Sequence, residues 1–274
     1  MVSAPAGGEA LLAVDVGNTN TVLGLWRGGE LVRHWRLTTR REATADEIAL
    51  SVRGLLADGP SSASLAAAAD GKPGAVRVIV ASVVPSLKFS LKQALRQVLG
   101  REPVFVEPGI KTGMPILYEV PQEVGADRIV NAVAAFDAVG GPCIVVDFGT
   151  ATTFDVVTAK GEYAGGVIVP GISISAEALF EKAARLWRVE IRRPEKVVGK
   201  TTASSIQSGL YFGYLSLVDG VIDRIAEEIA ARPRVIATGG LAELFGGGSE
   251  KIEQIDPLLT LKGLRLIDER NRGG

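Results

Sequence analysis

The sequence contains very little cysteine and histidine, and this excludes several classes of site. Cys143 is the only cysteine and His34 the only histidine among 274 residues. A single cysteine cannot form an intrachain disulfide, which fits a reducing, intracellular setting. A single histidine excludes a multi-histidine metal centre and any Ser-His-Asp triad without His34. We expect Cys143 in a core and His34 on a strand, both in structural roles.

Long apolar runs and a net charge are also missing. No stretch approaches the ~18 to 20 apolar residues that cross a bilayer, and residues 1–9 lack the basic-then-apolar pattern of a signal peptide. With 30 Lys and Arg against 31 Asp and Glu, the formal charge is −1, which provides no overall basic field for nucleic acid. The expectation is a cytoplasmic protein that binds neither membrane nor nucleic acid.

Two common nucleotide-binding signatures are absent as well. The sequence has neither G-x-x-x-x-G-K-[ST] nor G-x-G-x-x-G, which argues against P-loop and dinucleotide-binding folds. Any phosphate site must therefore be built in another way.

What the sequence does have is a pattern that occurs twice. Residues 11–26 read LLAVDVGNTNTVLGLW, and residues 144–157 read IVVDFGTATTFDVV. Each copy runs from apolar residues through Asp, an apolar residue and Gly into a cluster of Asn or Thr. Nearly half of the chain separates Asp15 from Asp147, so we expect two similar halves, residues 1–123 and 124–274, whose polar turns converge on one site.

Periodicity predicts three antiparallel strands and then alternating helices and strands in each half. The predicted strands are 11–16, 21–27, 31–37, 76–81, 103–106, 144–147, 152–158, 162–169 and 234–238. The predicted helices are 44–56, 86–99, 126–139, 172–184, 203–231, 241–245 and 258–271. Thr44 and Glu47 are spaced as a capping box. We expect residues 58–75 to be a loop without chemistry and 108–121 to connect the halves. This order predicts an α/β fold of two duplicated domains.

The first turn carries candidate phosphate ligands. Gly17 lets backbone approach a ligand closely, and the side chains of residues 18–20 with nearby N–H groups form a donor-rich pocket for phosphate oxygens. Asp15, at the strand end, can orient Mg²⁺ or its water shell beside phosphates. The alternative is an Asx-type turn that satisfies only its own backbone. The second copy favours the phosphate site.

The second turn, residues 147–153, offers hydroxyls in place of amides, so that the two turns form a phosphate clamp. Gly239 and Gly240 follow a strand and open a helix. They could let a flat nucleoside lie against backbone, although paired glycines often mark only a turn.

Asp127 and Arg128 begin a predicted helix. Asp127 could be a general base that accepts a proton from an attacking hydroxyl, or simply an acidic residue favoured by the helix dipole. Arg128 could meet an anionic substrate group or form a surface ion pair.

Six segments together resemble type III pantothenate kinases. They are DVGNTNTVLG, YEVPQEVGADR, VVDFGTATTFDVV, GGVIVPGI, KTTASSIQSG and ATGGLAELF, in the order found in that family. The resemblance covers nearly the whole chain. It implies the superfamily of sugar kinases, Hsp70 and actin, in which two RNase H-like domains close around an ATP cleft. It also implies ATP-dependent phosphorylation of pantothenate to 4′-phosphopantothenate, the first step of coenzyme A synthesis.

The resemblance further implies roles for individual residues. Asp127 looks like the proton acceptor, Asp147 like the ligand of a monovalent cation, and Asp15 like the residue that holds Mg²⁺ through phosphate or water. The implied ATP-binding residues are Asp15, Val16, Gly17, Asn18, Thr19, Asn20, Thr21, Val22, Thr150, Gly239 and Gly240. The implied substrate-binding residues are Tyr118, Gly125, Ala126, Asp127, Arg128 and Thr202. Many members have Asn before the substrate threonine, where this sequence has Thr201.

The implied cofactors are Mg²⁺ with ATP and either K⁺ or NH₄⁺, and the implied assembly is a homodimer. The apolar residues of 203–231 are compatible with a dimer face and equally with a buried intramolecular helix. Two alternatives stay open, namely another small-molecule kinase of the superfamily and a non-catalytic nucleotide-binding regulator.

Overall fold

The computed structural model describes residues 10–57, 76–183 and 186–272. Contacts divide the chain into two units. Unit 1 contains residues 1–113, 122–130 and 260–274, and unit 2 contains residues 114–121 and 131–259. The predicted loop 58–75 lies outside the described residues.

Unit 1 has a mixed five-stranded sheet in the order β3-β2-β1-β4-β5. Its strands are β1 (Ala10–Val16), β2 (Asn20–Arg27), β3 (Glu30–Thr38), β4 (Val76–Ser82) and β5 (Val104–Phe105). The central strand β1 is antiparallel to β2 and parallel to β4. The turn from β2 to β3 uses Gly28 and Gly29, both at positive φ, where glycine carries no steric cost.

Unit 2 repeats this topology. Its sheet has the order β10-β9-β6-β7-β8, so the sequence of pairings from β8 to β10 matches that from β3 to β5. The strands are β6 (Cys143–Phe148), β7 (Ala151–Val157), β8 (Tyr163–Pro170), β9 (Arg234–Gly239) and β10 (Gln254–Ile255). The prediction of two duplicated α/β domains is confirmed. Sequence reasoning missed β10, which is only two residues long.

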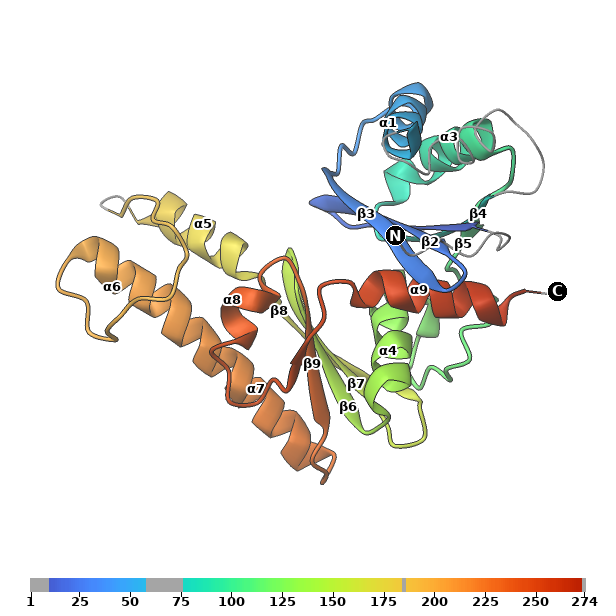
Figure 1. Cartoon of the computed structure of the whole chain (residues 1–274). Coiled ribbons are helices and arrows are strands. Elements are labelled where there is room, and N and C mark those ends of the chain that lie inside the picture. Colours follow the sequence, from blue (N-terminus) through green and yellow to red (C-terminus); the bar gives the residue numbers. More distant parts are fainter. Residues whose placement is uncertain (1–9, 58–75, 184–185, 273–274) are drawn as a thin grey trace, which may run out of the picture. The chain divides into compact units, whose positions relative to one another are not determined.

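Helices cover both faces of the unit 1 sheet (Figure 1). On one face lie α1 (Ala45–Ala57), the 3₁₀ turn η1 (Pro85–Leu87) and α3 (Lys88–Leu99), whose apolar side chains share a core with alternate residues of β1 and β2. The capping box of α1 is confirmed, because Thr44 N–H donates to Glu47 Oε2 at 2.8 Å and Glu47 N–H donates to Thr44 Oγ1 at 3.3 Å.

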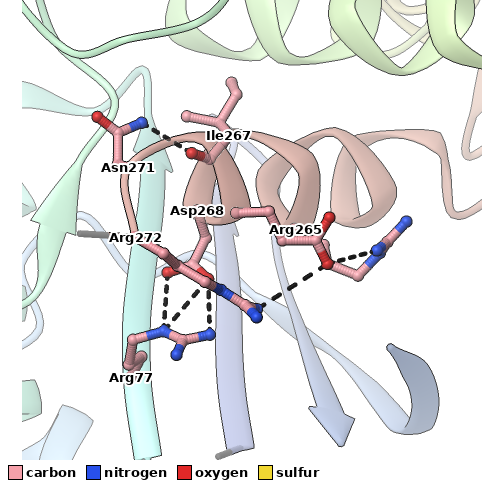
Figure 2. Close-up of polar contacts among 7 residues, drawn as sticks. Arg77, Arg265, Ile267, Asp268, Asn271 and Arg272 are labelled. Carbon is pink, nitrogen blue, oxygen red and sulfur yellow. Dashed lines mark hydrogen bonds and ion pairs between the residues drawn. The ribbon is translucent and has the colours of Figure 1, made fainter. Parts of the chain in front are cut away.

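The other face of the unit 1 sheet is covered by α9 (Leu259–Arg270). Figure 2 shows how its end is held. Asp268, largely buried, accepts hydrogen bonds from Arg77 Nη2 of β4 at 2.8 Å and from Arg272 Nε at 3.2 Å. Although α9 follows β10 in the chain, its described residues from 260 onward belong to unit 1. The predicted division of the chain between residues 123 and 124 therefore describes the sequence repeat, and as a domain boundary it stays a prediction.

Unit 2 also has helices on both faces of its sheet (Figure 1). The main core joins the sheet to α5 (Ile172–Lys182), α6 (Thr202–Ser208), the π-helical turn η3 (Gly209–Gly213), α7 (Tyr214–Glu228) and α8 (Ala242–Gly246). On the opposite face lies α4 (Ala126–Val139), which follows the 3₁₀ turn η2 (Pro121–Glu123).

The predicted helical region 203–231 is formed largely by α6, η3 and α7 in succession. A π turn accommodates one residue more than an α turn, and here Leu210, Tyr211 and Tyr214 are all buried in the unit 2 core. Ile225 is buried there too. The intramolecular interpretation holds for these residues, whereas Leu217 of the same region is exposed, and a dimer face there stays a prediction.

Two further expectations, for the single cysteine and the single histidine, are met. Cys143 is fully buried on β6, and burial raises the pKa of its thiol to about 12. His34 lies exposed on β3. Among the described residues, no helix has the length and apolar character needed to span a membrane.

Candidate active site

The first polar turn lies at the end of the central strand of unit 1. Asp15 is the penultimate residue of β1 and is paired on both sides, with Val22 of β2 and Ala81 of β4. Four residues, 17–20, connect the paired ends of β1 and β2. Gly17 N–H donates to Asn20 O at 3.0 Å, and a Cβ on Gly17 would lie 3.1 Å from that oxygen. The turn is therefore tight at the position where sequence analysis placed phosphate.

Arg41 joins this turn, and sequence reasoning missed it. Its Nη2 donates to Asn18 Oδ1 at 3.1 Å. The segment after β3 reaches the turn because Thr39 N–H donates to Thr19 O at 2.9 Å, and Thr21 Oγ1 lies 2.9 Å from Thr39 Oγ1. An exposed guanidinium thus lies beside the predicted phosphate ligands. The only signal in the sequence was a pair of arginines after a strand.

The second polar turn lies at the same place in unit 2. Asp147 pairs with Thr153 of β7 and Thr238 of β9. Only three residues, 149–151, connect β6 and β7 here, and Gly149 N–H donates to Ala151 O at 3.1 Å. Thr150 O accepts a hydrogen bond from Gly171 N–H at 3.1 Å, so the start of α5 holds the turn. The two turns are related but differ by one residue.

Asp147 has a defined environment within unit 2. Its Oδ2 accepts a hydrogen bond from Asn131 Nδ2 of α4 at 3.0 Å, and Asn131 is buried. A Cβ on Gly239 would lie 2.5 Å from Asp147 Oδ1, and Gly239 has φ +96°. Gly239 is therefore required both by its backbone conformation and by the carboxylate beside it. Sequence analysis missed Asn131, because a polar residue inside an amphipathic helix carries no motif.

Asp127 lies in the first turn of α4, in unit 1. Its Oδ1 accepts a hydrogen bond from Arg128 N–H at 2.8 Å, and a Cβ on Gly125 would lie 2.5 Å from the same oxygen. The absence of a side chain on Gly125 therefore leaves room for the carboxylate. Arg128 is only 8% exposed, so an ordinary surface ion pair does not describe it.

Tyr118 belongs to a segment that unit 2 holds by its backbone. Leu117 N–H donates to Tyr163 O and Tyr163 N–H donates to Pro115 O, both at 2.8 Å. The rings of Tyr118 and Tyr163 have centroids 6.4 Å apart. The segment predicted as a plain connection thus includes an ordered attachment to the first residue of β8.

Thr202 is the exposed first residue of α6, and Thr201 is the N-cap. The Thr201 side chain accepts a hydrogen bond from Ser204 N–H at 3.1 Å, and Ser204 Oγ accepts one from Thr201 N–H at 3.0 Å. Threonine and asparagine both cap helices. Thr201 therefore supplies a cap at the position where the sequence departs from the family's Asn.

The structure distributes the predicted site residues between the units. Unit 1 holds residues 15–22 and 125–128, and unit 2 holds Tyr118, Asp147, Thr150, Thr202, Gly239 and Gly240. Each set lies at strand ends, helix starts or in ordered loops of its own unit. That both sets converge on one nucleotide stays a prediction. Among the described residues, no group of three or more His, Cys, Asp or Glu is arranged to hold a metal by itself.

Comparisons with solved structures agree with this architecture. A Baf family protein from Campylobacter jejuni superposes with a TM-score of 0.57 at 18% identity, covering 95% of this chain and 98% of that one. The ethanolamine utilization protein EutJ from Carboxydothermus hydrogenoformans gives 0.54 at 16% identity, covering 96% and 92%. At such low identities these likenesses concern the fold alone, which is two α/β domains of matching topology.

Comparisons of sequence are more specific. The chain is similar to a type III pantothenate kinase of Koribacter versatilis, with 53% identity over 272 residues and 96% of each chain covered. It is also similar to one of Halalkalibacterium halodurans, with 52% identity over 262 residues that cover 95% of this chain and 99% of the other. The family model described as type III pantothenate kinase matches residues 11–224. The chain therefore belongs to the type III pantothenate kinase family.

Proposed function

We propose that this protein transfers the γ-phosphoryl group of ATP to pantothenate, giving 4′-phosphopantothenate in the first step of coenzyme A synthesis. The observation that carries the proposal is the family match over nearly the whole chain. The positions of Asp15, Asp127 and Asp147 support it, because each carboxylate lies at a strand end or helix start beside a glycine or a polar turn.

Asp127 is the proposed general base. The primary hydroxyl of pantothenate loses its proton to the Asp127 carboxylate as its oxygen forms a bond to the γ-phosphorus. The bond from phosphorus to the bridging oxygen of ADP breaks in the same displacement. The Arg128 N–H bond to Oδ1 fixes the orientation of the carboxylate. Catalysis of this kind rests mainly on positioning and charge stabilisation.

The turn of unit 1 is the proposed triphosphate site. Residues 15–22 present backbone N–H groups, carboxamides and hydroxyls, and Arg41 adds a positive charge. Mg²⁺ is usually bound by one or two carboxylates together with phosphates. Asp15 at the end of β1 fits that donor set without a further protein cage.

The turn of unit 2 is the proposed site of a monovalent cation, K⁺ or NH₄⁺, with Asp147 as its ligand. Asn131 donates to one oxygen of Asp147, and the other lies against Gly239, where a Cβ would overlap it. When bound, the two cations would neutralise phosphate charge. Thr150 is a proposed ATP contact, and Gly239 and Gly240 form the proposed adenosine side.

Pantothenate is proposed to contact Tyr118, Gly125, Ala126, Asp127, Arg128 and Thr202. Arg128 is the natural partner for the carboxylate of pantothenate, because a guanidinium can bind a carboxylate through two parallel hydrogen bonds. Its low exposure favours a bound anion over a purely solvated charge.

The activity is tested with a coupled assay for ADP, run with and without pantothenate and in K⁺ and then Na⁺ buffer. We expect pantothenate to accelerate ADP release, and K⁺ to support a faster rate than Na⁺. Mass spectrometry of the products across several hydroxyl and carboxylate acceptors identifies the substrate. A rate of ADP release that does not change with pantothenate would favour the alternative of a non-catalytic nucleotide-binding regulator. Phosphorylation of a different acceptor would favour another small-molecule kinase of the superfamily.

The general base is tested with Asp127→Asn, which removes the proton acceptor but keeps the size of the side chain. General base catalysis typically contributes about 10²–10⁴-fold, so we expect kcat to fall by that amount while ATP binding persists. Asp137→Asn is the matched control, because Asp137 lies exposed on the same helix. Near-normal turnover of Asp127→Asn would remove Asp127 from this role.

We also infer a homodimer and a cytoplasmic location, where ATP is available. Unit 2 exposes large apolar side chains at Trp187 (57%), Val197 (63%) and Val198 (79%). Exposed apolar side chains of this size are compatible with an interaction surface. Analytical ultracentrifugation tests this, with Trp187→Glu expected to give monomers. Phe89→Glu, at an exposed apolar residue of unit 1, is expected to leave the dimer intact.

A further inference from the structure

Two fully buried polar residues of unit 2 have no part in the mechanism above. Tyr163 Oη donates to Asp155 Oδ1 at 2.8 Å, and Thr153 Oγ1 donates to Asp155 Oδ2 at 3.0 Å. Phe154 and Val156 belong to the main core, so Asp155 points to the opposite face of the sheet. A carboxylate buried in this way loses its hydration, a cost that its hydrogen bonds and charged partners have to offset.

The duplicated fold shows that the architecture does not need this pair. Gly24 of unit 1 corresponds to Asp155 of unit 2. Each lies two residues beyond the residue that pairs across the strands with the site carboxylate, which is Asp15 in unit 1 and Asp147 in unit 2. In both sheets the register of strand pairing shifts just after the next residue. Beyond that shift, Leu31 of unit 1 corresponds in register to Tyr163 of unit 2.

The equivalent space in unit 1 is filled by apolar groups. A Cβ on Gly24 would lie 2.7 Å from Leu261 Cδ1 and 3.2 Å from Leu31 Cδ1. One copy of the fold therefore uses glycine and leucine where the other uses a buried carboxylate and a phenol. The requirement for Asp155 and Tyr163 must come from something that unit 2 has and unit 1 lacks.

Tyr118 is that feature. The segment that carries it is bound to Tyr163 through backbone hydrogen bonds on both sides, and the two rings are in contact at a 56° tilt. A Cβ on Gly165 would lie 3.7 Å from the Tyr118 ring, and Gly165 has φ +118°. Tyr118 is thus placed by Tyr163 and by Gly165, two residues further along β8.

We propose that Asp155 and Tyr163 are positioning residues that hold Tyr118 in the orientation in which it binds pantothenate. Asp155 fixes the phenol of Tyr163, whose ring and backbone in turn fix Tyr118. A contact ordered before binding lowers the entropy cost of taking up the ligand. The pair therefore sets the KM for pantothenate rather than the rate of phosphoryl transfer. This inference rests on the proposed role of Tyr118.

The first test is Tyr163→Phe, which removes the hydrogen bond to Asp155 and keeps the ring. A net hydrogen-bond contribution corresponds to about a 3- to 10-fold change in an equilibrium constant, so we expect the KM for pantothenate to rise by that factor. The kcat and the KM for ATP should stay within about twofold. Tyr211→Phe is the control, since Tyr211 is equally buried in unit 2 but bonds to Leu244 O, and its pantothenate KM should not change.

A double-mutant cycle shows whether Tyr163 acts through Tyr118. We expect Tyr118→Ala to raise the pantothenate KM, and Tyr163→Phe to add nothing in that background. Independent, multiplicative effects would overturn the inference, as would a Tyr163→Phe variant whose kinetics are normal while Tyr118→Ala is impaired. A normal pantothenate KM in Tyr118→Ala would instead refute the proposed role of Tyr118, and the inference with it.

Discussion

The two units share one topology but differ at corresponding positions. The turn of unit 1 has four residues rich in amides, with Arg41 beside it, whereas that of unit 2 has three residues and carries hydroxyls. Beside the site carboxylate, unit 1 has Ser82 at the end of β4 and unit 2 has Gly239 at the end of β9. Corresponding positions that are alike in the two units maintain the common sheet topology. Those that differ indicate that the two turns have different roles in the site.

The largest expected contrast is between the two site carboxylates. Asp15→Asn should lower kcat by about 100-fold, comparable with the loss of one strong electrostatic contact to a transition state. Asp147→Asn should have a smaller effect on kcat and should abolish the difference between K⁺ and Na⁺ buffers. Steady-state kinetics in both buffers measures this. Equal behaviour of the two variants would show that the turns perform one task.

The second contrast concerns the strand ends beside these carboxylates. Gly239→Ala should destabilise the protein by about 2 kcal/mol, because φ +96° is strained for alanine and its Cβ would overlap Asp147 Oδ1. Ser82→Ala loses only a weak hydrogen bond from Val84 N–H at 3.3 Å and should cost about 0.5 kcal/mol. Urea unfolding compares the two, and similar losses would contradict the assigned role of Gly239.

A third contrast concerns the positive charge of Arg41 beside the turn of unit 1, which we expect to contribute to ATP binding. Arg41→Gln should raise the KM for ATP by about 1.5- to 5-fold, the range of an exposed ionic contact, and the effect should shrink at high salt. Arg40→Gln is the neighbouring control and should behave like the wild type. A salt-independent change would point to altered folding of the turn.

The smallest expected effect is a pH dependence that comes from the buried thiol of unit 2. Cys143 lies at the register position of Leu11 of unit 1, and burial raises the pKa of its thiol from 9.0 to about 12. The unfolded chain therefore loses this proton first, so the contribution to stability is complete well below pH 9 and declines as the pH rises through 9 towards 12. Between pH 8 and 9 the loss is about 0.4 kcal/mol.

Cys143→Ala removes this contribution, and chemical unfolding at several pH values measures the difference in slope. Native protein should also resist alkylation at pH 8, with labelling appearing only on unfolding. Rapid labelling of the folded protein would show that the thiol is accessible.

Much of the fold followed from local patterns, and the exceptions have physical causes. The apolar runs around Asp15 and Asp147 and the capping box at Thr44 predicted their elements, because strand alternation and capping depend on near neighbours. The π turn η3 and the short strand β10 were missed, since buried packing and pairing with β9 decide them. The site residues were predicted by motif and resemblance. Arg41 and Asn131 were not, because they reach the turns only through contacts distant in sequence.

The sequence by itself determined the duplication, the two acidic turns and the family, since repeated short patterns and motif order are local properties of a chain. Tertiary structure alone decided that α9 packs on the sheet of unit 1, that Gly239 makes room for Asp147, and that Tyr163 holds Tyr118. Each of these depends on which groups come within a few ångströms after folding, and no local pattern records that.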